Sequence, residues 1–166
     1  FTVQRRNGVV MPDLDVVLIE KGRRLGGGNR WFWLAGDMSR DGVELISGLR
    51  KTEWDKGCAL RFPTGQRHLS IPCALLAAPD LEAGLRRVLP AEAILTGRAI
   101  AALATDGVWL EDDTKIPART VIDCRGFEPS DDLTGGWRAS LGRYVKVASP
   151  HGLTAPVIMD GSVDDG

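Results

Sequence analysis

Apolar positions near the start of the chain form one continuous run instead of alternating with polar ones. The run covers residues 14–19, ends in Glu20 and is followed by Gly22. Continuous, largely β-branched residues are typical of a strand that is buried on both faces, as in a parallel sheet covered by helices. The pattern therefore predicts a short buried strand with an acidic residue at its carboxyl end.

Two later stretches have helical rather than strand-like spacing. The first follows Ser39, a residue type that caps helices, and the second lies between Asp80, a predicted N-cap, and Pro90, which ends it. In each stretch the apolar residues would form one stripe on a helix. They are Val43, Ile46 and Leu49 in the first stretch and Leu81, Leu85, Val88 and Leu89 in the second.

The segment after the second helix predicts a meander of strands separated by tight turns. Residues 94–104 and 108–110 are apolar runs on either side of Thr105-Asp106-Gly107, which is the pattern of a β-hairpin. A polar turn at 112–115 then leads into residues 116–118. We expect these pieces to form a small antiparallel unit.

Two further apolar runs complete the predicted elements. One, at 119–126, has the pattern of a buried strand that runs into a turn at Gly126, and the other covers 155–160. Buried strands that alternate with helices are typical of α/β proteins. We therefore expect an α/β fold, with the meander as an insertion. The succession of a strand, an acid, a glycine, a basic pair and a double glycine between residues 14 and 28 recurs in flavoproteins that bind two dinucleotides. This resemblance implies an incomplete Rossmann-like FAD/NAD(P)-binding domain of the two-dinucleotide-binding flavoprotein type.

Glu20 is the candidate for cofactor recognition. A carboxylate at the tip of the second strand of a Rossmann-type unit accepts hydrogen bonds from the ribose diol of a dinucleotide. The glycine-rich phosphate turn of such units lies roughly 20 residues upstream of this acid, at or just before Phe1, and only Gly8 falls in that interval. The G-x-G-x-x-G turn is thus not in this chain, and we expect the chain alone to bind FAD weakly or not at all. The alternative is that Glu20 is a solvated strand end.

The loop after Glu20 and a second glycine turn supply the remaining candidates. Glycines let a main chain approach a phosphate or a flavin ring closely because they lack a Cβ. The alternative is a flexible surface turn. Ligands of open α/β sheets bind at the carboxyl ends of the strands, where both turns are predicted. The candidate cofactor-binding residues are Glu20, Arg24, Gly27, Gly28, Asn29, Asp123, Arg125 and Gly126.

Composition narrows the function classes. The 166 residues carry a net charge of −1 and are 43% hydrophobic, which suits a globular protein and gives no basic footprint for nucleic acid. The three cysteines are dispersed and the histidines number two, so we expect buried thiols in a reducing compartment and no metal site. The chain begins at Phe1 and ends in the turn sequence 164–166, and we expect it to be incomplete.

Tryptophans and one histidine leave functional alternatives open. The five tryptophans could line a pocket for a long apolar polyene, where aromatic faces stabilise a carbocation, or they could be ordinary core residues. His151 could act as an acid or base, but no nucleophile motif accompanies it, which favours a structural role.

Three stretches of the chain resemble the bacterial lycopene β-cyclases of carotenoid biosynthesis. The resemblance runs over nearly the whole chain, and its last stretch is the most specific. The stretches are Leu18-Ile19-Glu20-Lys21-Gly22 with Gly27-Gly28-Asn29, Arg61-Phe62-Pro63-Thr64 with Ser70-Ile71, and Pro150-His151-Gly152-Leu153-Thr154 with Pro156-Val157-Ile158-Met159-Asp160.

The resemblance implies a redox-neutral, acid-catalysed cyclisation of lycopene end groups to β-ionone rings. It implies reduced FAD as the cofactor, NAD(P)H as the source of its electrons, and a cytoplasmic protein held peripherally at the membrane that supplies lycopene. It also divides the chain into a partial FAD-binding domain, 1–150, and the start of a substrate-binding domain, 151–166, containing the first strand of a substrate-binding sheet. The catalytic acid is expected outside this chain.

The sequence departs from the family pattern at two places. Arg30 stands where the family's Asn-His-Thr-Trp has histidine, and Cys124 replaces a glycine in the second turn. Two rival interpretations therefore stay open. The parent could be an FAD-dependent monooxygenase or geranylgeranyl-reductase-like oxidoreductase of the same fold, or the chain could be a truncated, non-catalytic remnant.

Overall fold

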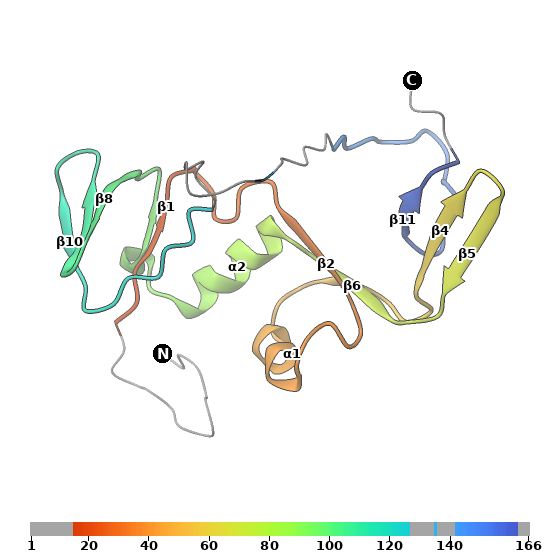
Figure 1. Cartoon of the computed structure of the whole chain (residues 1–166), viewed down its shortest axis with the longest axis horizontal. Coiled ribbons are helices and arrows are strands. Elements are labelled where there is room, and N and C mark those ends of the chain that lie inside the picture. The colour runs from red at the N-terminus through yellow and green to blue at the C-terminus, as the bar shows by residue number, and fades with distance from the viewer. Residues whose placement is uncertain (1–14, 127–134, 136–141, 163–166) are drawn as a thin grey trace.

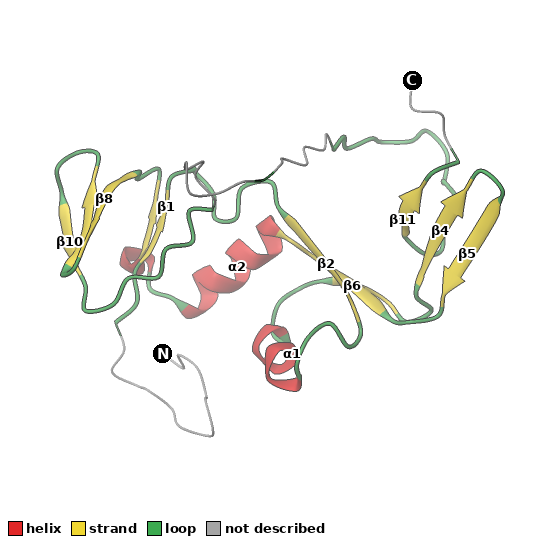
Figure 2. Ribbon diagram, in the orientation of Figure 1, coloured by secondary structure: helices red, strands yellow, loops and turns green. Residues whose placement is uncertain are grey.

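A computed structural model describes residues 15–126, 135 and 142–162 of the chain. In the part described, two helices of at least seven residues and several small sheets are spread along one long axis (Figure 1). A β-meander lies at one end and a second three-stranded sheet at the other, with a helix and a third sheet between them (Figure 2). The mixed α/β class expected from the sequence is confirmed.

The predicted acidic strand is present but shorter than expected, as β1, Leu18–Glu20, and its residues are half-buried rather than buried. It pairs in parallel with β7, Ile94–Thr96, so that Glu20 lies beside Thr96 at the carboxyl end of both strands. Ile94 is buried, as a strand in the interior of an α/β layer requires. This parallel pair with helix α2 between its strands in the sequence is the α/β element that positions Glu20.

The second predicted helix is present as α2, Ala78–Val88, and it ends before Pro90 as expected. The prediction that Asp80 caps it is wrong, because the N-cap is Ala77 and Asp80 lies in the first turn. Pro79 explains the shift, since proline has no N–H to be satisfied and its fixed φ suits the first helical turn. A short 3-10 helix, η1 (Ala91–Ala93), then leads into β7.

The first predicted helix is α1, Arg40–Ile46. The side chain of Ser39 accepts a hydrogen bond from the Gly42 amide at 3.1 Å, so the predicted cap is confirmed. Where α1 ends, the chain packs on α2: the guanidinium of Arg87 donates to the Gly48 carbonyl at 3.1 Å. A side chain of α2 thus holds the segment that follows α1, while Val43 of α1 is 51% exposed and no residue of α1 is buried.

A long hairpin, which the sequence did not predict, connects two of the sheets. Its first side is β3 (Thr52–Trp54) followed by β4 (Cys58–Phe62), and its second side is β5 (Gly65–Leu69) followed by β6 (Cys73–Ala77). The β3 and β6 strands pair antiparallel, as do β4 and β5. The hairpin therefore runs from one sheet into the next.

Each half of this hairpin acquires one further strand. In the first sheet, β2 (Arg30–Leu34) pairs antiparallel with β6, which gives the order β2-β6-β3. In the second, β11 (Val157–Asp160) pairs in parallel with β4, which gives the order β11-β4-β5. The strand expected at 155–160 is thus confirmed.

The predicted meander is confirmed, with one difference. It consists of β8 (Ile100–Ala104), β9 (Gly107–Leu110) and β10 (Lys115–Pro117), all antiparallel. The single strand expected at 94–104 is broken, because Gly97 has φ +69° and turns the chain between β7 and β8. A left-handed residue of this kind interrupts a strand ladder.

The buried strand expected at 119–126 is wrong. These residues form no strand and are exposed, with Ile122 82% exposed. Their β-branched character favours a strand only where a neighbouring strand and a packed face are present. The expectation of buried thiols holds for Cys58 and Cys73 but not for Cys124, which is exposed because it lies in this segment.

Candidate functional site

Glu20 closes β1 with its side chain turned back on the main chain. One carboxylate oxygen, Oε1, accepts a hydrogen bond from the Gly22 amide at 2.7 Å. The distance is at the short end of the range for charge-assisted hydrogen bonds. Glu20 is half-buried, and a carboxylate offers about four acceptor positions in all, so further positions stay available to a ligand hydroxyl.

The main chain of the same turn is fixed by the turn that follows β7. The Arg98 amide donates to the Glu20 carbonyl at 3.1 Å, and the Gly97 amide donates to the Gly22 carbonyl at 2.8 Å. The Arg98 guanidinium in turn pairs with Asp112 at 2.5 Å. The meander is thereby attached to the acidic turn through Arg98.

These supporting residues were not predicted from the sequence. Gly97 lies inside the run predicted as one strand over 94–104 and precedes a basic residue. A single glycine within a strand pattern is the signal that could have marked a break there. The partnership with Gly22 depends on the parallel pairing of β1 and β7, and no local pattern encodes that pairing.

The glycine loop between β1 and β2 lies on the amino end of α2. The Asn29 carbonyl accepts a hydrogen bond from the Ala78 amide at 3.1 Å, and the Asn29 amide donates to the Gly26 carbonyl at the same distance. Gly26 is packed, since a Cβ there would lie 3.0 Å from the Trp31 ring and 3.2 Å from Ala78. These bonds and contacts hold the loop against the first turn of α2.

Gly27 and Gly28 behave differently from Gly26. No heavy atom lies within 4 Å of the position that a Cβ would take at either residue, and Gly27 has φ +57°. Their main chain is therefore open on that side, as close approach of a ligand requires.

Arg24 and Arg30 lie on either side of this loop. The Arg24 Nε atom lies 3.6 Å from Glu82 of α2, while its side chain is 73% exposed. The Arg30 guanidinium lies 4.1 Å from the centre of the Tyr144 ring, a distance typical of a cation–π contact. Arg30 therefore brings the segment around residue 144 next to the glycine loop.

The second predicted turn, Asp123 to Gly126, contains hydrogen bonds between its own residues. The Asp123 carboxylate accepts hydrogen bonds from the Arg125 amide at 3.1 Å and from its Nε and Nη2 atoms at 2.9 Å each. These bonds lower the pKa of Asp123 to about 2. Gly126 has φ +97°. The contacts of the Asp123 carboxylate thus lie within its own turn and do not reach Glu20, so a site shared by both turns stays a prediction.

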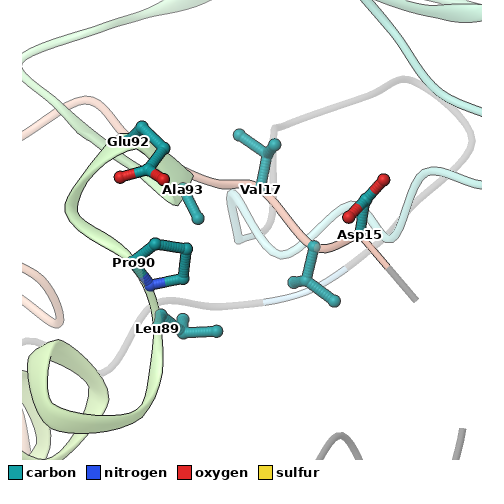
Figure 3. Close-up of a pocket in the computed structure, with 7 residues that line it drawn as sticks. Asp15, Val17, Leu89, Pro90, Glu92 and Ala93 are labelled. Carbon is teal, nitrogen blue, oxygen red and sulfur yellow. The ribbon is translucent and has the colours of Figure 1, made fainter. Parts of the chain in front are cut away.

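A cavity of about 250 Å³ lies at the opposite end of the parallel pair. Figure 3 shows the side chains of Val17, Leu89 and Ala93 around it, with the carboxylates of Asp15 and Glu92 on either side. These residues precede β1 or β7 or follow α2. Ligands of parallel sheets bind at the carboxyl ends of the strands, so this cavity is separate from the Glu20 turn.

The histidine and tryptophan alternatives are partly resolved. The Nδ1 atom of His151 accepts a hydrogen bond from the Leu153 amide at 3.0 Å, which supports its structural role.

Trp31 and Trp33 lie on one face of their sheet and Trp54 on the other, as the strand registers require. These three do not line one pocket together. Trp137 lies outside the described residues.

The part of the chain that the structure describes contains neither a candidate metal site nor a candidate membrane-spanning helix. It contains no group of three or more His, Cys, Asp or Glu residues that could hold a metal ion. Within the same residues, no helix is both long and apolar enough to cross a membrane.

Comparison with known proteins decides the family. The family model for the lycopene cyclase protein matches residues 5–165. This chain belongs to the lycopene cyclase family. The match includes the Glu20 turn, the glycine loop and β11, so the family resemblance seen in the sequence is confirmed.

Three curated relatives of this lycopene cyclase family member are named lycopene β-cyclase. Those from Pantoea ananas, a Paracoccus species and Pseudescherichia vulneris are 29%, 32% and 28% identical to it over 153, 157 and 152 residues. Each alignment covers 92% of this chain but only 39–40% of the relative. No solved structure matches the chain significantly.

Proposed function

We propose that the protein to which this chain belongs is a lycopene β-cyclase, which converts the linear end groups of lycopene into β-ionone rings. The observation that carries the proposal is the match of residues 5–165 to the lycopene cyclase family. The net reaction is an isomerisation. A proton adds to the linear end group, the ring closes through a tertiary carbocation, and loss of a ring proton leaves the double bond.

FAD is the proposed cofactor, bound by a Rossmann-like domain. The residues present fit its adenosine half, because Glu20 offers carboxylate oxygens at the carboxyl end of β1 and is held by the Gly22 amide. Open main chain at Gly27 and Gly28 suits the approach of a phosphate or flavin group. When bound and reduced by NAD(P)H, FAD would supply electrostatic stabilisation of positive charge near the substrate.

The remaining candidate residues are proposed to position the cofactor. Asn29 fixes the glycine loop on α2 through its carbonyl, while Arg24 lies at the rim with an exposed guanidinium. Asp123, Arg125 and Gly126 form a separate turn that would contact the cofactor from a second direction. All of these residues bind and orient, and none is proposed as the proton donor.

The sheet of β11, β4 and β5 supports an apolar substrate. Strand registers place Leu60, Phe62 and Met159 on one face, beside Arg67 of β5, and the ion pair of Arg61 and Asp160 on the other. Phe62 and Met159 are 41% and 54% exposed. Apolar side chains that stay partly exposed on one face of a sheet suit contact with a hydrocarbon chain. Because such a substrate resides in lipid, we propose that the protein is cytoplasmic and associates peripherally with the membrane.

Production of the protein at its native length, in a bacterial host that accumulates lycopene, tests this function. The expected result is loss of lycopene and appearance of carotenoids of the same mass with one or two β-ionone rings. A hydroxylated or hydrogenated product would support the oxidoreductase alternative. Unchanged lycopene beside soluble, FAD-loaded protein would contradict cyclisation and favour a non-catalytic remnant.

A further inference from the structure

The turn that ends β1 is held in a single conformation by the main chain around it. The carbonyls of Glu20 and Gly22 both accept hydrogen bonds from consecutive amides of the neighbouring turn, those of Arg98 and Gly97. Two bonds to adjacent donors fix both the position and the direction of this three-residue segment. The amide of Gly22 is thereby held in place before any ligand binds.

That fixed amide acts on the Glu20 carboxylate. The Gly22 N–H donates to Oε1 at 2.7 Å, and a bond of this kind to a charged acceptor is stronger than one between neutral groups. A glutamate side chain otherwise samples several rotamers, and restricting them has an entropic cost. Here the protein has already met part of that cost, which is how preorganised sites gain affinity.

The absence of a side chain at residue 22 is part of the same arrangement. A Cβ there would lie 3.2 Å from Glu20 Oε1, 3.6 Å from the Arg24 carbonyl and 3.8 Å from Glu20 Cδ. The first distance is tighter than an ordinary contact, so the carboxylate would have to move by a few tenths of an ångström. Gly22 has no positive φ, so alanine would displace the carboxylate without straining the main chain.

We propose that Gly22 is a positioning residue for cofactor recognition: its amide presets the Glu20 carboxylate for the 2′-hydroxyl of an adenosine ribose, and its missing side chain leaves the carboxylate there. The inference rests on the proposed binding of FAD by this turn. It adds a residue that acts through Glu20 and does not itself contact the ribose. The ligand class is a nucleotide with a free 2′-hydroxyl.

The test compares Gly22→Ala with Gly48→Ala in the flavin-free protein at native length. Gly48 is the matched control because it is exposed, has no positive φ and has no heavy atom within 4 Å of its Cβ position. Affinities for ADP and for 2′-deoxy-ADP are measured by calorimetry. We expect Gly22→Ala to weaken ADP binding about 3- to 10-fold, the range for one weakened hydrogen bond, and Gly48→Ala to leave it unchanged.

The two nucleotides distinguish positioning from a merely structural effect. If Gly22 acts through the 2′-hydroxyl, its substitution lowers the preference for ADP over 2′-deoxy-ADP, whereas loss of fold would weaken both ligands equally. An equal loss for both nucleotides, or no loss for either, overturns the inference.

Glu20→Ala separates the inference from the proposed function. If Glu20→Ala weakens ADP binding while Gly22→Ala does not, the positioning role is wrong and FAD binding by the turn stands. If Glu20→Ala leaves the affinity for ADP unchanged, cofactor binding by this turn and the role of Gly22 are both wrong. The same follows if neither the unsubstituted protein nor any variant binds ADP at millimolar concentration.

Discussion

Substitution of Gly57 tests how the long hairpin joins its two sheets. Gly57 lies between β3 and β4 with φ +88°, and it is buried. A Cβ at this residue would lie 1.8 Å from the Leu69 carbonyl oxygen and 3.0 Å from the Ile71 amide nitrogen. Both atoms belong to the main chain, so neither can move aside by a change of rotamer. Gly57→Ala must therefore push apart the two sides of the hairpin where the main chain of residues 69–71 approaches Gly57.

The expected cost has two parts. A left-handed main chain costs a non-glycine residue about 1–2 kcal/mol, and overpacking a filled site costs about 1–3 kcal/mol. We expect Gly57→Ala to lower the free energy of unfolding by about 2–5 kcal/mol. Urea denaturation measures this loss of stability. Tryptophan fluorescence is the signal, because Trp54 pairs with Cys73 close to Gly57 in the sequence.

Gly36→Ala is the matched control for this experiment. Gly36 also has a positive φ, +103°, but nothing lies within 4 Å of its Cβ position. It should show the conformational cost alone, about 1–2 kcal/mol. If the two substitutions destabilise the protein equally, the close approach of the Leu69 carbonyl to Gly57 is refuted.

Three further results are expected. Glu20→Ala in the protein at native length should weaken FAD binding by about 1–3 kcal/mol, the cost of unpaired polar partners; an unchanged affinity in a fluorescence titration would remove Glu20 from the site. Asp123 should titrate by NMR with a pKa of about 2, so its ionised form supports the turn above about pH 4 and this support is lost as the pH falls to 2. Replacing Arg125 by alanine should move that midpoint upward. Cys124 should react with a thiol reagent in the folded protein well before the two buried cysteines, whereas equal rates would contradict their burial.

The sequence predicted the elements whose signals are local. The Ser39 cap, the end of α2 before Pro90 and the turn at 105–107 are each encoded within a few residues. The acidic strand was also found, because a continuous apolar run that ends in an acid is distinctive. Family membership followed from motifs distributed over the chain.

Elements that depend on distant partners were missed or wrong. Strands β2 to β6 pair through a register that only the folded hairpin provides, and no element is predicted from the sequence at β2. Residues 119–126 were expected to be a strand, but propensity alone does not supply a partner. The support of Glu20 by Arg98 likewise depends on the pairing of β1 with β7.

Redox-neutral cyclisation is the activity that we propose for the protein at its native length. The most direct measurement follows NAD(P)H consumption and ring formation together, in the FAD-loaded protein at native length with lycopene in lipid vesicles and oxygen excluded. We expect many rings to form for each NAD(P)H consumed, and the product to have the mass of lycopene. Consumption of one NAD(P)H for every product molecule, with a change in mass, would contradict it.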